Sequence, residues 1–137
     1  MDRKEFCVLM AKAKQESGRG TSDISFDMKM LLPTLRRFEK GEHNFNLKKV
    51  MEYLQVINAH IQIDKDIIAN YENLLAWLVD VRKTHYLSQR ALAKEIECAP
   101  LTIANIEREE TIISIDTFLK IVDVLGCTIN IENNKIV

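Results

Sequence analysis

The sequence is poor in turn-forming residues and contains no long apolar run. Its 137 residues include 4 glycines and 2 prolines, too few for the many tight turns of a β-sandwich or β-barrel. The longest apolar run has six residues, so no membrane-spanning helix is expected. Three cysteines, Cys7, Cys98 and Cys127, have no close spacing, which predicts reduced and mostly buried thiols in a cytoplasmic protein. The composition, 47% hydrophobic and 28% charged, is typical of one ordinary folded domain or two very small ones.

The charge of the chain is nearly balanced overall but unevenly distributed. The net charge is −1, which argues against a histone-like polycation. Residues 1–63 carry 11 basic and 8 acidic side chains, whereas residues 64–137 carry 8 basic and 12 acidic ones. We therefore expect a polyanionic partner to bind the first part of the chain.

The chain repeats itself at a spacing of 68 residues. This shift aligns the two parts without gaps, and Thr34, Glu39 and Ile61 are among six residues that recur unchanged. The order of structural signals repeats as well. In each part an apolar stripe of helical spacing follows a good N-cap residue, Asn46 or Ser114, and a segment of alternating apolar residues comes last. Each part is therefore predicted to contain four helices and one strand.

The expected elements follow from these stripes and from the caps and glycines. In residues 1–63, called the first half below, the helices are expected around 6–13, 22–28, 33–40 and 47–54, with a strand at 59–63. In residues 71–137, the second half, they are expected around 74–81, 88–96, 100–108 and 115–122, with a strand at 127–131. Pro33 and Pro100 should each lie in the first turn of a helix.

The join at residues 64–70 lacks the composition of a flexible linker. Two lone strands would leave two exposed sheet edges, which proteins usually avoid. We therefore hypothesise that the two strands pair with each other and relate the halves by a pseudo-twofold axis.

A motif in residues 87–109, LSQRALAKEIECAPLTIANIERE, has the spacing of two helices joined by a tight turn. It resembles the phage Cro/repressor-like (XRE-type) helix-turn-helix family, in which Leu-Ser-Gln opens one helix and Thr-Ile and an apolar-Glu pair lie in the next. Glu97 and Glu109 stand where the family has glycine. The first half is more divergent but keeps Thr34, Glu39 and the glycine Gly41. The resemblance thus suggests two tandem copies, clearer in the second half.

The resemblance implies that the second helix of each motif enters the major groove of DNA. In the first half the candidate DNA contacts are mostly basic, and they are Lys29, Pro33, Arg36, Arg37, Lys40, Lys48 and Lys49. In the second half Pro100, Leu101, Ala104 and Asn105 are expected on the groove-facing side. Asn105 could pair with adenine and Leu101 could contact a thymine methyl group, while Gln89, Arg90, Lys94 and Arg108 would contact phosphates.

The two candidate surfaces differ in charge. Residues 29–49 hold six basic side chains against two acidic ones, whereas residues 97–117 hold Arg108 against five acidic side chains. We therefore expect the first half to dominate affinity for DNA. Glu39 and Glu107 are expected to form structural bonds within their own halves, and Trp77 and Cys98 are expected in the core.

Taken as a whole, the sequence predicts a DNA-binding transcription regulator. No phosphate-binding loop or nucleophile motif is present, and the three histidines have no metal-ligand spacing, so neither an enzyme nor a cofactor or metal is expected. The expected partner is double-stranded DNA, with a homodimer or a partner protein left open and no membrane or small-molecule substrate. An alternative function is a protein–protein interaction module, antitoxin-like or a scaffold, with weak or no DNA binding.

Overall fold

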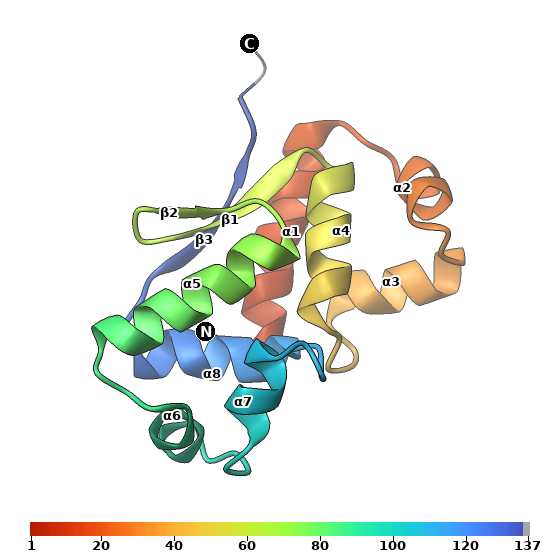
Figure 1. The fold of residues 1–137 in the computed structure, drawn as a ribbon. Helices are drawn as coiled ribbons and strands as arrows, with labels where there is room; N and C mark the ends of the chain where they lie inside the picture. The colour runs from red at the N-terminus through yellow and green to blue at the C-terminus, as the bar shows by residue number, and fades with distance from the viewer. Residues whose placement is uncertain (136–137) are drawn as a thin grey trace.

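The computed structural model describes residues 1–135 and is mainly helical (Figure 1). These residues form eight helices and three strands. The elements of the first half are α1 (Arg3–Ser17), α2 (Thr21–Met28), α3 (Leu32–Lys40), α4 (Leu47–Val56) and β1 (Ala59–Ile63). The remaining elements are β2 (Asp66–Ile68), α5 (Tyr71–Thr84), α6 (Gln89–Glu95), α7 (Thr102–Glu107), α8 (Ile115–Val124) and β3 (Ile129–Asn133). Each helix overlaps one of the expected helices, so the mainly helical fold class is confirmed.

The helices begin and end where their capping residues stand. The side chains of Asn46 and Ser114 accept hydrogen bonds from the backbone N–H of Lys49 and Thr117, at 2.8 and 3.2 Å. Both predicted N-caps are therefore confirmed. Pro33 lies in the first turn of α3 as expected, but Pro100 precedes α7, which begins at Thr102.

Left-handed backbone positions recur at the spacing of the sequence repeat. Apart from Asp64, every described residue with a positive φ has a counterpart exactly 68 residues away. The counterparts are Gly18 and Tyr86, Lys29 and Glu97, Gly41 and Glu109, and Asn58 and Gly126. The chain therefore reverses direction at the same places in both halves, although the residue types differ.

The strands form one small antiparallel sheet in the order β2-β1-β3. β1 pairs with β3, as hypothesised, and one pair of the ladder joins Gln62 with Asn130, two residues that are themselves 68 apart. Two expectations are corrected. The join contains a third strand, β2, which pairs with β1, and β3 begins at Ile129, two residues later than expected.

A second contact between the halves repeats this reciprocal pattern. Around the bridge between the two N-cap residues of α4 and α8, the amide of Leu47 donates to the carbonyl of Ile113 at 2.9 Å. The amide of Ile115 donates to the carbonyl of Phe45 at 2.8 Å. Exchanging the two halves converts one of these hydrogen bonds into the other.

One continuous apolar core extends through both halves. Trp77 is buried, as expected, and its ring lies 6.0 Å from that of Phe118. Cys7 is also buried, but Cys98 and Cys127 are only half-buried, which corrects the expected core position of Cys98. No helix of the described part is long and apolar enough to cross a membrane.

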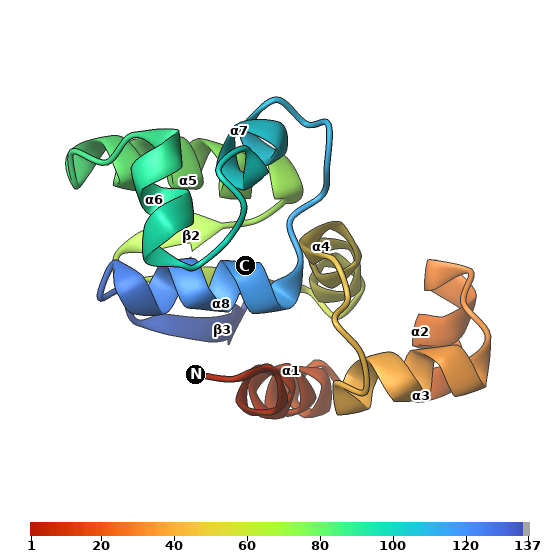
Figure 2. The same cartoon turned by 90° about the horizontal axis from the view of Figure 1, so that it is seen from below.

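The helix pairs α2–α3 and α6–α7 lie away from the sheet. In Figure 1, α2 and α3 lie at the right and α6 and α7 at the bottom, whereas the sheet lies toward the upper left. Figure 2 shows the same two helix pairs at separate ends of the molecule, with α4 between them. Each pair therefore has a face open to solvent.

Candidate nucleic-acid interface

Helices α6 and α7 form the two arms of the motif found in the second half. Ser88 caps α6 by accepting a hydrogen bond from the N–H of Ala91 at 3.0 Å. The helix ends in a left-handed residue, Glu97, after which the amide of Cys98 donates to the carbonyl of Ala93 at 2.8 Å. This pair of features is a Schellman turn, and it directs the chain into α7 without a glycine.

An ion pair between α5 and α7 fixes the position of α7. The guanidinium of Arg82 donates two hydrogen bonds to the carboxylate of Glu107, at 2.7 and 2.9 Å, and the two side chains are only 10% and 8% exposed. Gln89 also donates to Glu107, at 3.0 Å. Burial alone would raise the pKa of Glu107, but the hydrogen bonds from Arg82 and Gln89 outweigh it and hold the pKa below its usual range.

The first half contains the same ion pair 68 residues earlier. Lys14 on α1 lies 2.9 Å from the carboxylate of Glu39 on α3. Tyr53, whose pKa is raised by burial, keeps its proton and donates to Glu39 at 2.6 Å. Lys14 also donates to Thr21, which opens α2 as Gln89 opens α6. The structural role expected for Glu39 and Glu107 is confirmed.

Fewer of the expected residues are exposed on the outward face of α7. Leu101 and Arg108 are exposed and Asn105 is half-exposed. Ala104, however, is only 7% exposed, so its expected place on the groove-facing side is wrong. Pro100 is exposed but lies in the turn before the helix. The Arg108 guanidinium donates to the side-chain oxygen of Asn105 at 2.7 Å, so the two polar side chains of this face bind each other.

The outward face of α3 carries a stripe of exposed residues that we call the basic stripe. It consists of Pro33, Arg36, Arg37 and Lys40, all of them exposed. The opposite face is held in the core by Leu35 and Phe38, which are almost fully buried. Within the described part of the chain, the three cations of the stripe form no ion pair. Their charges are therefore open to a polyanion.

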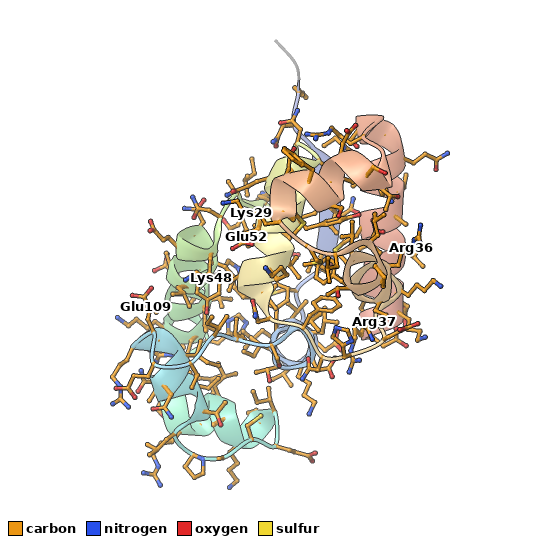
Figure 3. The ribbon with its side chains drawn as sticks, turned by 90° about the vertical axis from the view of Figure 1, so that its right-hand side faces the viewer. Lys29, Arg36, Arg37, Lys48, Glu52 and Glu109 are labelled. Carbon is orange, nitrogen blue, oxygen red and sulfur yellow. The ribbon has the colours of Figure 1, made fainter. Side chains whose placement is uncertain are left out.

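The other expected cations of the first half lie apart from this stripe. Figure 3 shows Arg36 and Arg37 on one side of α3, while Lys29 and Lys48 lie on the other. The ammonium of Lys48 is 5.9 Å from the centre of the Tyr71 ring, a cation–π contact across the seam between the halves. Lys49 is paired with Glu52 at 3.4 Å.

Helix α6 has its own exposed cations. Arg90 and Lys94 are exposed one turn apart, and together with Cys98 and Pro100 they line a shallow hollow. Gln89, by contrast, is half-buried and already bound to Glu107. Of the predicted contacts on α6, Arg90 and Lys94 are thus the ones free to reach a phosphate.

The second half is less acidic at its surface than its sequence indicates. The carboxylate of Asp116 lies 2.6 Å from the guanidinium of Arg3, whose hydrogen bond lowers the pKa of Asp116. Glu107 is likewise neutralised, by Arg82. The exposed acidic residues near α7 are therefore Glu97, Glu109 and Glu110. The sequence offered no signal for the Arg3 pair, because its partners are 113 residues apart.

Comparison with known proteins supports the motif in the second half. A family model described as helix-turn-helix matches residues 78–131, a range that begins in α5 and ends in β3. No curated protein and no solved structure matches the chain. The family is one of DNA-binding regulatory proteins and is generally non-enzymatic. Residues 78–131 are thus similar to a helix-turn-helix domain, and α6 and α7 are the two helices that lie within the motif.

Proposed function

We propose that this protein binds double-stranded DNA in a sequence-specific manner and regulates transcription, in a phage, a mobile element or a bacterial control circuit. The observation that carries the proposal is the basic stripe on α3, whose arginines and lysine have no ionic partner in the described residues. It occupies the same position in the first half as the matched recognition helix α7 does in the second. We expect the protein to act in the cytoplasm, without a cofactor.

We propose further that the chain is a single-chain pseudo-dimer of two helix-turn-helix units, residues 1–63 and 71–137. This division is supported by the left-handed positions, ion pairs and interhalf hydrogen bonds that recur at 68 residues. Both recognition helices lie away from the sheet (Figures 1 and 2). In this proposal they enter successive major grooves on one side of the duplex, about 34 Å apart.

The equivalence of the halves also indicates which candidate residues would contact bases and which would contact phosphates. Arg37 is the counterpart of Asn105, at the centre of the outward face of α7, and Lys40 is the counterpart of Arg108. We propose that Arg37 reads a guanine edge and Asn105 an adenine edge. The counterpart of Arg36 is the buried Ala104. Arg36 therefore lies at the margin of the stripe, where a phosphate contact is the better fit.

The two half-sites should accordingly differ in sequence and in strength. Within the described residues, the first half offers three cations without an ion pair on α3, whereas the second offers Leu101, Asn105 and an Arg108 that is paired with Glu110. Arg90 and Lys94 on α6 supply phosphate contacts to the second half. A perfect palindrome is not expected as the target of one chain.

The test is fluorescence anisotropy of a labelled random duplex, titrated with protein between about 50 and 200 mM salt. Four cations are left for phosphates in this proposal, Arg36, Lys40, Arg90 and Lys94, and four such contacts predict a loss of affinity of roughly 150-fold across this range. A steep salt dependence supports the proposal and justifies selecting the preferred sequence from a random library. Absence of binding even at the lowest salt concentration contradicts it.

A second candidate function is a protein-interaction module, and it is favoured by one observation. In the second half, Arg108 at the end of α7 is bound by Asn105 and Glu110, and Gln89 on α6 is bound by Glu107. These side chains would have to exchange partners before contacting DNA. If binding to DNA is absent or does not depend on salt, this candidate is preferred.

A further inference from the structure

The two edges of the sheet differ in how they are covered. At the β3 edge, α1 packs against the strand, and the side chain of Asn133 donates to the carbonyl of Ala13 on α1 at 2.9 Å. At the other edge, β2 pairs with β1 alone. Within residues 1–135, the backbone of residues 66–68 forms no backbone hydrogen bond outside this pairing. The outward side of β2 therefore keeps N–H and C=O groups that can pair with another strand.

A hollow of about 570 Å³ lies between β2 and α5. One wall is the face of α5 that runs from Asn73 through Asp80 to Thr84, and these three residues are exposed. The other wall is β2, where Ile67 is 61% exposed. The face of α5 is about 16 Å long, which is the length of an extended segment of five residues. The hollow thus has room for one more short strand beside β2.

The charged side chains that line this hollow are both acidic. Asp66 lies on the β2 wall and Asp80 on the α5 wall, and both are exposed. Among the residues that the structure describes, neither has an ionic partner. Free carboxylates on both walls attract a cationic segment. A second copy of this chain that paired through its own β2 would instead bring four such carboxylates together, which disfavours self-association at this edge.

We propose that this surface binds an extended, basic segment of a different protein. We call it the edge groove, and it consists of residues 66–68 and the face of α5 from Asn73 to Thr84. The segment adds a fourth strand to the sheet by forming main-chain hydrogen bonds with the free side of β2. Because side chains alternate along a strand, basic residues at its first and fifth positions reach Asp66 and Asp80. A small apolar residue at the third position then fits against Ala76, which is exposed between them.

The edge groove is separate from the candidate DNA contacts. In the described part of the chain, no candidate DNA contact lines it. Figures 1 and 2 both show β2 next to α5 and on the side of the molecule away from α3. Binding of the basic segment therefore leaves the basic stripe open, and the proposal does not rest on the proposed DNA binding.

The experiment is an NMR titration of the DNA-free, ¹⁵N-labelled protein with the peptide Lys-Thr-Val-Thr-Lys, acetylated and amidated at its ends. We expect a Kd of about 1 mM, as for a short peptide with few contacts. The amide chemical shifts should change at residues 66–68 and along the α5 face of the groove. The peptide Glu-Thr-Val-Thr-Glu, with the same caps, should cause no change there.

Variants of the two carboxylates test the charge complementarity. Asp66→Asn with Asp80→Asn should weaken binding of the basic peptide about 10-fold. Asp66→Lys with Asp80→Lys should transfer binding to the acidic peptide. Glu72→Gln is the matched control, because Glu72 is exposed on the same helix but lies outside the edge groove. It should leave the Kd unchanged.

Methylation of the peptide backbone tests the addition of a strand. Neighbouring residues of a strand direct their N–H groups to opposite edges. Methylating the valine amide and methylating the two threonine amides should therefore have unequal effects, with one of the two peptides bound about 10-fold more weakly.

Several results would overturn the proposal. These are equal binding of the acidic peptide, shift changes that are absent or lie elsewhere, equal loss in Glu72→Gln, and equal effects of the two methylated peptides. Shifts at residues 66–68 that change with protein concentration alone would also overturn it, because they would assign this edge to a second copy. Since no DNA is present, failure here is distinguishable from failure of the proposed DNA binding.

Discussion

Helices α3 and α7 occupy equivalent places in the two halves, yet they present different side chains to solvent. α3 exposes Arg36, Arg37 and Lys40, while α7 exposes Leu101 and an Arg108 that is bound to Asn105. The more basic of these two helices, α3, lies outside the range that the family model matches, since the match begins at residue 78.

The difference between α3 and α7 shows that the family match depends mainly on buried residues that pack the two helices together. In the second half, the motif residues Leu92, Ile103 and Ile106 are buried, and Glu107 is bound to Arg82. These residues set the angle between α6 and α7 and are not available to DNA. The residues that could contact DNA are on the surface, where the two halves are free to differ.

Charge reversal on the recognition helix of the first half should have the largest effect on DNA binding. Arg36→Glu with Arg37→Glu is expected to weaken binding at least about 100-fold, because each lost contact is worth about 1–3 kcal/mol and the new charges repel phosphates. The matched variant in the second half, Gln89→Ala with Arg90→Glu, should weaken it less. Anisotropy at fixed salt compares them, and the reverse order would mean that the second half dominates affinity.

Breaking the two equivalent ion pairs should destabilise the halves unequally. Glu107→Ala leaves Arg82 buried without its partner and should lower the free energy of unfolding by about 3 kcal/mol. Glu39→Ala should cost about 1 kcal/mol, because Lys14 and Glu39 are more exposed, at 23% and 18%. Urea denaturation followed by circular dichroism measures both values. Equal losses would contradict the view that the second half depends more on its ion pair.

The ion pair between Arg82 and Glu107 should also make the stability of the fold depend on pH in the acid range. The pKa of Glu107 is lower in the folded protein than in the unfolded chain, where it is close to 4.5. The stabilisation is therefore fully present above that pH and is lost as the pH falls through the folded pKa. Urea midpoints measured between about pH 7 and pH 3 should drop more in the wild type than in Glu107→Gln. Parallel curves would exclude Glu107 as a source of the pH dependence.

Much of the fold was predictable because the signals were local. Apolar spacing and capping residues such as Asn46 and Ser114 located the helices, and period-two alternation located β1 exactly. Strand β2 was missed because it has three residues, and because the turn before it uses Asp64 in a left-handed conformation where glycine or asparagine is the usual signal.

The candidate site was less predictable because exposure depends on neighbours distant in sequence. Ala104 was expected to face the groove, but α7 contacts both α5 and α6, and a small side chain is easily covered by its neighbours. The acidity around Asp116 was overestimated because Arg3 neutralises it from the other end of the chain. The exposure of Phe26 and Leu31, 84% and 77%, was not predictable because large apolar residues are usually buried.

Replacing the glycines at two left-handed positions should show how much of the loss of stability comes from backbone strain and how much from steric contact. Gly18→Ala and Gly41→Ala share a φ near +70°, but a Cβ at Gly41 would meet the sulfur of Cys7 at 3.0 Å, whereas one at Gly18 would meet nothing within 4 Å. We expect losses of about 1 kcal/mol for Gly18→Ala and about 2 kcal/mol for Gly41→Ala. Thermal denaturation compares them, and equal losses would show that the Cys7 contact relaxes without cost.

The smallest effect is expected when glycine is introduced into the second half. Two glutamates there have a left-handed backbone conformation at positions where the family has glycine. Glu109 is the counterpart of Gly41, with a φ of 62°, and Glu97 has a φ of 59°. Glu109→Gly and Glu97→Gly should each raise the free energy of unfolding by about 0.5 kcal/mol, since relief of strain exceeds the added freedom of the unfolded chain. Glu109→Ala and Glu97→Ala are the controls, because they remove the same charge but keep the strain. If the alanine variants are as stable as the glycine variants, the two glutamates are unstrained, and their cost to the protein is electrostatic alone.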